Sequence, residues 1–115
     1  VFLVPVNKEL NLKKAAISVG EKSIEMLKSK DLLPLTGYIH GGCSPIGMKK
    51  QFKTVIDISA NNYDNIIFSG GKIGYQVELT LEDLKKVISF TLASITELWK
   101  ILIKNVIKKL TILFF

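Results

Sequence analysis

Apolar residues fall in short runs along most of the chain, and turn-forming residues separate the runs. Val1–Val6 predicts a buried strand, and β-branched residues predict a second strand over Thr54–Ile58. Ile66–Ser69 and the alternating segment Tyr75–Leu79 predict two more. Several strands with few helices indicate a mixed β-sheet, barrel-like in form and flanked by helices, so we expect an α+β fold.

Capping residues indicate where helices begin and end. Asn11 is expected to cap a short helix that stops near Gly20, because its side chain can accept from the first free backbone N–H groups. Thr80 is expected to cap another helix for the same reason. Asp31–Leu33 predicts only a helical turn, since Pro34 breaks a helix.

The last stretch, Ser89–Phe115, follows a different pattern. Its apolar residues recur at spacings of three and four with a Lys-rich stripe between them, which predicts an amphipathic helix. We therefore expect a domain over residues 1–88 and a C-terminal helix over 89–115. That helix could dock on the sheet or lie on a membrane surface, or the stretch could be a divergent tail. No membrane span is predicted, because no apolar run reaches about 18 residues.

The charge and the cysteine content of the chain indicate a cellular compartment and a class of partner, but they do not identify one partner. The chain of 115 residues has 16 basic and 10 acidic side chains, a net charge of +6, and all the basic ones are Lys. This balance favours anionic partners, although a solvated Lys-rich surface has the same composition. The single Cys excludes an internal disulfide and fits a reducing compartment, so we expect a cytoplasmic protein.

Two glycine-rich segments are the candidates for chemistry. Gly37–Gly47 contains Gly-Gly-Cys-Ser-Pro, and Phe68–Gly74 places Ser-Gly-Gly-Lys at the end of a predicted strand. Glycine lets backbone N–H groups approach a carbonyl oxygen or a phosphate closely. Each segment taken alone is equally well explained as a structural loop. Neither matches a P-loop or a dinucleotide fingerprint.

Cys43 and His40 invite comparison with a nucleophile and its base. They lie three positions apart in one loop with no third residue to orient them, which makes a poor case for a Cys/His pair. Ligands for a zinc site are also too few. We expect neither a metal nor another cofactor. The Lys residues that follow this loop, Lys49, Lys50 and Lys53, could meet RNA phosphates or form a solvated face.

Taken together and in this order, the two segments resemble the YbaK/EbsC family, which is related to the editing domain inserted in bacterial prolyl-tRNA synthetases. The pair Gly-Gly-x-Ser-Pro-x-Gly, over Gly41–Gly47, and Ser-Gly-Gly-Lys, over Ser69–Lys72, carries the resemblance. Thr54–Asp57 and Val77–Leu79 also fit in order, and the resemblance extends from Val1 to about Ile88.

This resemblance implies an aminoacyl-tRNA deacylase that acts on the aminoacylated acceptor end of tRNA, with prolyl-tRNA synthetase as a further partner. The nearest branch implies release of cysteine from Cys-tRNA(Pro), with the substrate's own thiol attacking its ester. It implies catalytic roles for the backbone at Gly41, which would hold the carbonyl oxygen, and for Ser69. The implied substrate-binding residues are Gly42, Ser44, Pro45, Gly70 and Lys72.

Departures from the family pattern keep alternatives open. The family's pocket also uses a Lys and aromatic residues upstream of Val1, so we expect an N-terminally incomplete domain whose isolated activity is reduced. Ile73 and Gln76 stand where family members often carry Arg and an acid, which bears on substrate choice. The alternatives are editing of Ala-tRNA(Pro) and a non-catalytic module that binds tRNA or associates with the synthetase.

Overall fold

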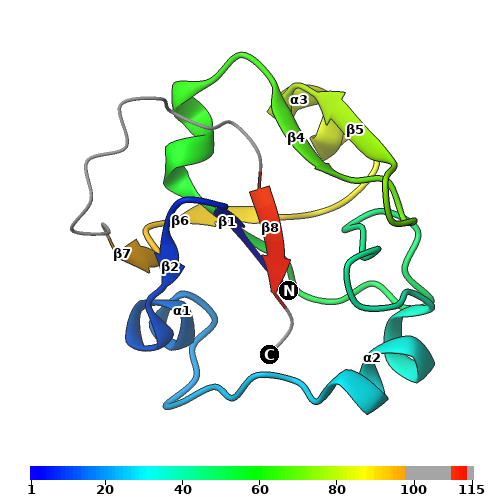
Figure 1. The fold of residues 1–115 in the computed structure, drawn as a ribbon. Helices are drawn as coiled ribbons and strands as arrows, with labels where there is room; N and C mark the ends of the chain where they lie inside the picture. The colour runs from blue at the N-terminus through cyan, green and yellow to red at the C-terminus, as the bar shows by residue number, and fades with distance from the viewer. Residues whose placement is uncertain (98–109, 114–115) are drawn as a thin grey trace.

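A four-stranded mixed sheet organises the chain in the computed structural model, which describes residues 1–97 and 110–113 (Figure 1). The helical elements are α1 Leu12–Ser18, α2 Ser29–Thr36, the 3₁₀-helix η1 Ile58–Asn62 and α3 Leu81–Lys85. The strands are β1 Phe2–Pro5, β2 Glu9–Leu10, β3 Val55–Asp57, β4 Ile66–Ser69, β5 Gln76–Leu79, β6 Thr91–Ala93, β7 Thr96–Glu97 and β8 Leu110–Leu113.

The main sheet has the strand order β6-β3-β1-β8. β1 pairs in parallel with β3, β3 pairs in parallel with β6, and β8 lies antiparallel to β1. Two smaller sheets pair β2 with β7 and β4 with β5. The α+β prediction with a mixed sheet is confirmed, but the strands of the described residues do not close into a barrel.

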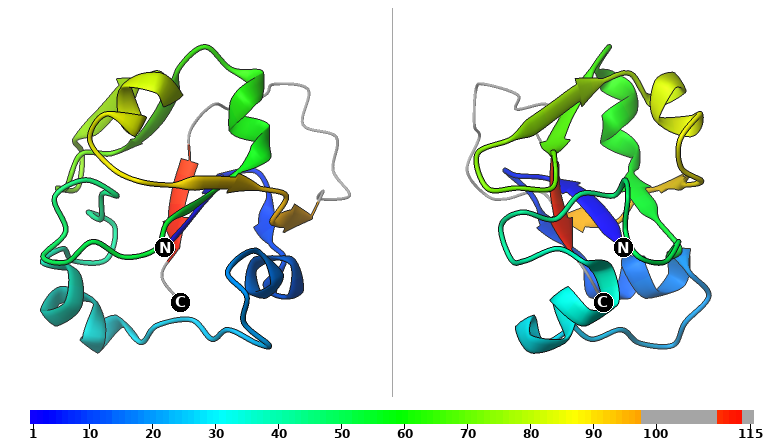
Figure 2. Two further views of the ribbon diagram at one scale, coloured as in Figure 1. Left: turned by 180° about the vertical axis from the view of Figure 1, so that it is seen from behind. Right: turned by 90° about the vertical axis from the view of Figure 1, so that its right-hand side faces the viewer.

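Alternate residues of β1 and β3 bury opposite faces of this sheet, as strand geometry requires. Leu3 and Ile56 pack with Phe68 of the β4–β5 hairpin in one apolar cluster, which also contains Ala60 of η1 and residues of α3. On the other face, a second cluster joins Phe2, Val4 and Val55 to Ala15 of α1 and to Ile95. Figure 2 shows α1 on one side of the sheet and η1, the hairpin and α3 on the other.

Local capping signals are confirmed. The Asn11 side chain accepts a hydrogen bond from Lys14 N at the start of α1, and Thr80 accepts one from Asp83 N at the start of α3. Both bonds satisfy N–H groups that have no partner inside the helix.

The prediction that helix breaks before Pro34 is wrong, because α2 continues through Pro34 to Thr36. The proline costs the helix one backbone hydrogen bond, and hydrogen bonds made after the proline stabilise the end of the helix. Gly37 adopts a left-handed φ of 83° and its N–H donates to Leu33 O at 2.9 Å. The Thr36 hydroxyl also donates to Leu32 O.

The predicted C-terminal helix is wrong wherever the structure describes that stretch. Residues 91–93 form β6 in the main sheet, residues 96–97 form β7, and residues 110–113 form β8 beside β1. Pairing with open strand edges satisfies the backbone here, and tertiary pairing of this kind overrides a local helical period. The remainder of that prediction, residues 98–109 and 114–115, lies outside the described residues.

No helix among the described residues has the length and apolar character needed to cross a membrane.

Candidate functional site

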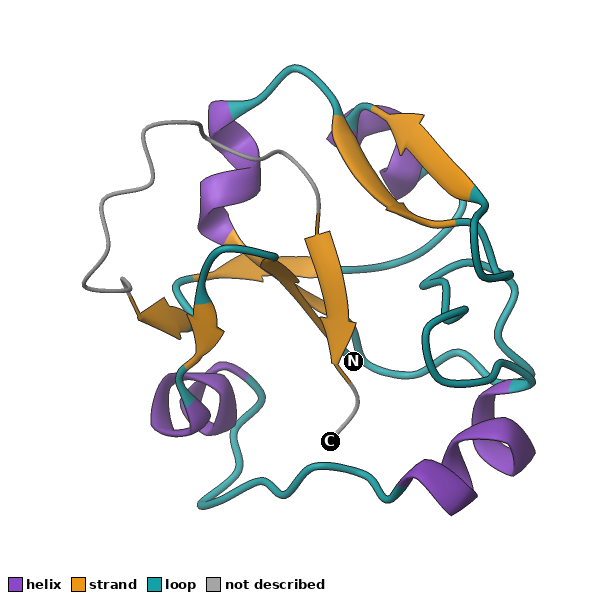
Figure 3. Ribbon diagram, viewed as in Figure 1, coloured by secondary structure: helices purple, strands orange, loops and turns teal. Residues whose placement is uncertain are grey.

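The two glycine-rich segments meet in space. A Cβ added to Gly42 would lie 3.3 Å from both Ile73 N and Lys72 Cα, and one added to Gly41 would lie 3.7 Å from the Ile73 side chain. The loop after α2 and the turn between β4 and β5 are therefore in backbone contact, and Figure 3 shows both beside each other in teal. We call residues 37–47 and 69–75 together the glycine-loop site.

Tyr38 fills the space between the two loops. A Cβ at Gly71 would meet its ring at 3.0 Å, and one at Gly47 would meet its hydroxyl oxygen at 2.9 Å. The hydroxyl donates a hydrogen bond to Ile46 O, and Tyr38 N donates to the buried hydroxyl of Thr36. The Tyr38 side chain therefore packs against glycines of both loops, and sequence reasoning gave it no role.

The backbone N–H groups of Gly41 and Gly42 in the first loop differ in their hydrogen bonding. Gly42 N donates to Ile39 O at 3.0 Å and so closes a turn. Gly41 is exposed and has a left-handed φ of 83°, and its N–H has no acceptor among the described residues. An exposed N–H held by a turn can bind a carbonyl oxygen as an oxyanion-hole donor does. Gly41, rather than Gly42, is the available donor.

Ser44 and Pro45 are buried inside this loop. The Ser44 side-chain oxygen accepts from Ile46 N at 3.2 Å. This bond and the fixed φ of proline hold the loop in shape.

The second loop is ordered by its own backbone. Gly70 N donates to Tyr75 O at 2.8 Å, and Tyr75 N donates to Lys72 O at 3.1 Å. Ser69 is half-buried at the end of β4, and its oxygen accepts from Gly71 N at 3.4 Å. The hydroxyl proton of Ser69 remains able to donate. Gly70 and Lys72 are exposed, so Lys72 can meet an anion by its charge.

Cys43 is unsuited to nucleophilic attack. Its side chain is 8% exposed and its thiol lies 3.2 Å from Ile39 O. Burial raises the pKa of the Cys43 thiol, so less of the reactive thiolate forms. His40 is exposed at the surface. No group of three His, Cys, Asp or Glu side chains suited to a metal ion occurs in the part of the chain that the structure describes.

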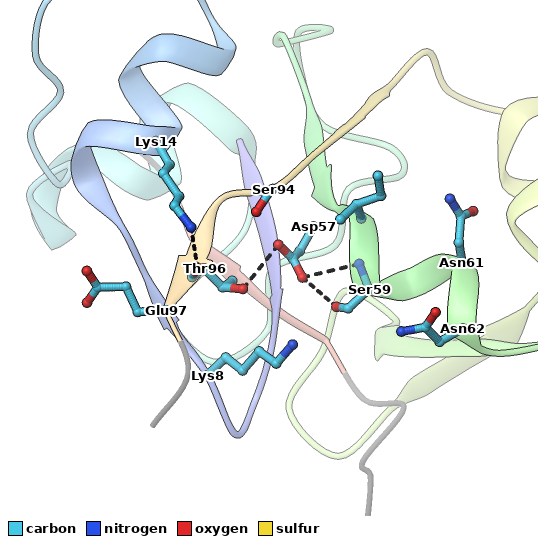
Figure 4. A pocket seen from close by; sticks show the side chains of 10 residues that line it. Lys8, Lys14, Asp57, Ser59, Asn61, Asn62, Ser94, Thr96 and Glu97 are labelled. Atoms are coloured by element: carbon cyan, nitrogen blue, oxygen red, sulfur yellow. Dashed lines mark hydrogen bonds between the residues drawn. The ribbon is translucent and has the colours of Figure 1, made fainter. Parts of the chain in front are cut away.

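Sequence reasoning missed a second polar region, a crevice of about 670 Å³. We call it the carboxyl-end crevice, because it opens beyond the last residues of β1, β3 and β6 (Figure 4). Its lining residues are Lys8, Lys14, Asp57, Ile58, Ser59, Asn61, Asn62, Ser94, Thr96 and Glu97. Nothing in the sequence marks these positions as a group, since four separate segments supply them.

Comparison with known proteins identifies relatives of this chain. The model of the aminoacyl-tRNA editing domain family matches residues 1–87. A protein of Enterococcus faecalis named EbsC, provisionally assigned as a Cys-tRNA(Pro)/Cys-tRNA(Cys) deacylase, is 51% identical over 96 residues. The match covers 84% of this chain and 58% of EbsC, so the chain spans less than two thirds of that relative.

Two solved structures have a fold similar to that of this chain. A protein provisionally described as a trans-editing enzyme for prolyl-tRNA synthetase is 25% identical, with a TM-score of 0.73, over 84% of this chain and 60% of its own. A protein solved in work on epitope backbone grafting onto scaffold proteins is 26% identical, with a TM-score of 0.76, over 84% of this chain and 63% of its own.

Proposed function

Because this chain belongs to the aminoacyl-tRNA editing domain family, we propose that the protein is an aminoacyl-tRNA deacylase. The reaction is hydrolytic removal of a wrongly attached amino acid from the acceptor end of tRNA. One observation carries the proposal: the glycine-loop site has on adjoining loops the N–H of Gly41, which has no acceptor in the part of the chain that the structure describes, and the Ser69 hydroxyl. Both groups can bind the ester without a charged side chain.

We propose cysteine as the amino acid and Cys-tRNA(Pro) as the substrate, supported by the 51% identity to EbsC. The thiol sulfur of the substrate attacks its own ester carbonyl carbon and forms a C–S bond. The C–O bond to the ribose breaks, and the proton of the thiol passes to the departing ribose oxygen. Water then opens the resulting thioester ring and releases cysteine.

In this scheme the protein supplies position and charge stabilisation. Gly41 N–H donates to the carbonyl oxygen as negative charge develops on it. The Ser69 hydroxyl donates to the aminoacyl group or the terminal ribose, and Lys72 faces a phosphate of the acceptor end. Gly42, Ser44, Pro45 and Gly70 shape the surface that the aminoacyl group contacts. Buried Cys43 takes no part in bond formation.

The partner is charged tRNA, and the place of action is the cytoplasm, where charged tRNA is used. Prolyl-tRNA synthetase is a further partner in this proposal, because one solved relative is described as a trans-editing enzyme for that synthetase.

A substrate series tests the proposal. The first-order loss of amino acid is measured under single-turnover conditions for Cys-tRNA(Pro), Ser-tRNA(Pro) and Ala-tRNA(Pro). A thiol nucleophile predicts fast loss of cysteine, loss of serine slower by at least about 100-fold because a hydroxyl is a far weaker nucleophile at neutral pH, and no loss of alanine. Buffer without protein gives the baseline for each ester.

The other outcomes separate the alternatives. Equal clearance of cysteine and serine would contradict attack by the substrate thiol. Clearance of alanine with cysteine left in place would move the protein to the Ala-tRNA(Pro) branch. Binding of the acceptor stem with no loss of any amino acid would mark a non-catalytic tRNA-binding module.

A further inference from the structure

The carboxyl-end crevice lies where the chain leaves neighbouring parallel strands toward opposite faces of the sheet. After β1 the chain leads to α1, whose Ala15 packs on one face. After β3 it enters η1, whose Ala60 packs on the other. Between parallel strands whose connections diverge in this way, a crevice opens at the carboxyl ends, and α/β proteins commonly bind ligands there. In Figure 1, α1 and η1 diverge below and above β1 and β3.

Asp57 is one of the residues that line this crevice. The residue is 2% exposed, and one oxygen of its carboxylate accepts from Ser59 N and Ser59 Oγ. The other oxygen accepts from Ile95 N at 3.1 Å and from Thr96 Oγ1 at 3.2 Å. Four donors use the lone pairs of a carboxylate. Asp57 therefore fixes the ends of β3 and β6 and has no capacity left for a ligand.

Several hydrogen-bond donors of the described crevice residues are not committed to an ion pair. Neither Lys8 nor Lys14 forms an ion pair among the described residues, and Lys14 Nζ makes one long bond of 3.4 Å to Thr96 O. The side chains of Asn61 and Asn62 also line the crevice and have no partner within the described ranges. In Figure 4, Asn62 points toward Lys8, whereas Asn61 points away from it. Glu97, at the opening, already accepts from Asn11 at 2.7 Å.

We propose that the carboxyl-end crevice is a second ligand site, distinct from the glycine-loop site, which binds the phosphate ester of a nucleotide. Two ammonium groups suit a phosphate. The Asn amides offer both donors and acceptors to a base or ribose. The volume lies in the range of small-molecule sites, about 300–1,000 Å³. The same chemistry is offered by a free nucleotide or by a nucleotide within RNA.

Binding is tested with AMP, inorganic phosphate and an uncharged acceptor-stem RNA, each titrated into the ¹⁵N-labelled chain at fixed salt. AMP or the RNA is expected to shift the amide signals of Ser59 and Asn61. Lys8→Met and Lys14→Met are each expected to weaken that binding about 10-fold, the size of one charge-assisted hydrogen bond. Lys85→Met is the matched control, because Lys85 is an exposed Lys of α3 outside the crevice.

The outcomes decide both the site and its source of ligand. Shifts with AMP support a free nucleotide, and shifts with RNA alone support a nucleotide of the acceptor stem. No shift at Ser59 and Asn61 with either probe would overturn the proposal. So would equal weakening by Lys85→Met, or inorganic phosphate binding as tightly as AMP. Deacylation is not measured in this experiment, so its result is independent of the function proposed for the glycine loops.

Discussion

The glycine-loop site and the carboxyl-end crevice are built in opposite ways. The first uses backbone N–H groups and small side chains, among them the N–H of the exposed Gly41, which has no acceptor within the described residues. The second uses the long side chains of Lys8, Lys14 and two Asn residues around a saturated carboxylate. A backbone site can bind a carbonyl oxygen at close range with little charge, whereas a side-chain site attracts an anion over a longer distance.

This difference explains what each region leaves in the sequence. Backbone approach requires glycine, as at Gly42, where any side chain would press on the backbone of the facing turn. The requirement produces a recognisable motif. The crevice needs only side chains that the strand ends bring together, and such residues carry no spacing rule. The first region could thus be predicted from sequence, while the second became visible only with the sheet topology.

The largest effect is expected from the first of two substitutions, one in each region, which together test whether the regions act separately. Gly42→Val forces the loops apart, because its Cβ alone would lie 3.3 Å from backbone atoms of Lys72 and Ile73. Deacylation should fall by at least about 100-fold, as when one oxyanion donor is displaced. Overpacking should lower the free energy of unfolding by about 1–3 kcal/mol. Nucleotide binding at the crevice should stay within two-fold, about 0.4 kcal/mol. Single-turnover rates, thermal melts and AMP titration measure the three quantities.

Lys8→Met is the reciprocal variant. It should weaken AMP binding about 10-fold and leave the single-turnover rate of deacylation at saturating Cys-tRNA(Pro) within about three-fold of wild type, less than 1 kcal/mol in barrier height. If both variants lowered both activities equally, the two regions would form one site and the comparison would fail.

A smaller effect tests whether contact between the two loops influences the rate of deacylation. Gly71 and Gly74 both have left-handed φ values, 101° and 88°, so an Ala at either costs about 1–2 kcal/mol. Only at Gly71 would the new Cβ meet Tyr38, at 3.0 Å, whereas Gly74 faces open space. Gly71→Ala should therefore lower the deacylation rate about 10-fold more than Gly74→Ala, equal to about 1.4 kcal/mol in the barrier. Equal rates for the two variants would show that loop contact does not affect the reaction.

Tyr38→Phe should have a milder effect. It keeps the ring between the loops and removes only the hydrogen bond to Ile46 O. We expect a loss of about 1 kcal/mol in the free energy of unfolding, the usual net value of one hydrogen bond. Denaturant titration measures it. Tyr63→Phe is the control, because the Tyr63 hydroxyl makes no hydrogen bond within the described residues and should change stability little.

The smallest effect is expected at Cys43. Cys43→Ala should leave the deacylation rate within about two-fold, since the thiol takes no part in the chemistry, and a two-fold change is near 0.4 kcal/mol. Burial raises the pKa of this thiol in the folded chain above its unfolded value. The unfolded chain therefore loses the proton first, and the thiol's contribution to stability falls as pH rises above about 8.5. Unfolding curves from pH 7 to 10 should show a shallower decline for Cys43→Ala.

Local signals in the sequence predicted local structure well. The caps at Asn11 and Thr80 depend on neighbours within three residues, so the sequence contains all the information they need. The helix through Pro34 was missed because its end is secured by Gly37 and Thr36, beyond the proline itself. The strands β6 and β8 were missed because their partners, β3 and β1, lie far away in the chain. A helical period cannot reveal an open sheet edge.

The central claim is that Gly41 and Ser69 act on the same bound aminoacyl group. The most direct measurement is a ¹⁵N amide titration with unphosphorylated adenosine that carries cysteine through a non-hydrolysable amide at its 3′ position. The account predicts that the Gly41 and Ser69 signals shift together along one saturation curve, while those of Ser59 and Asn61 at the crevice stay in place. Shifts confined to the crevice, or at Gly41 without Ser69, would contradict it.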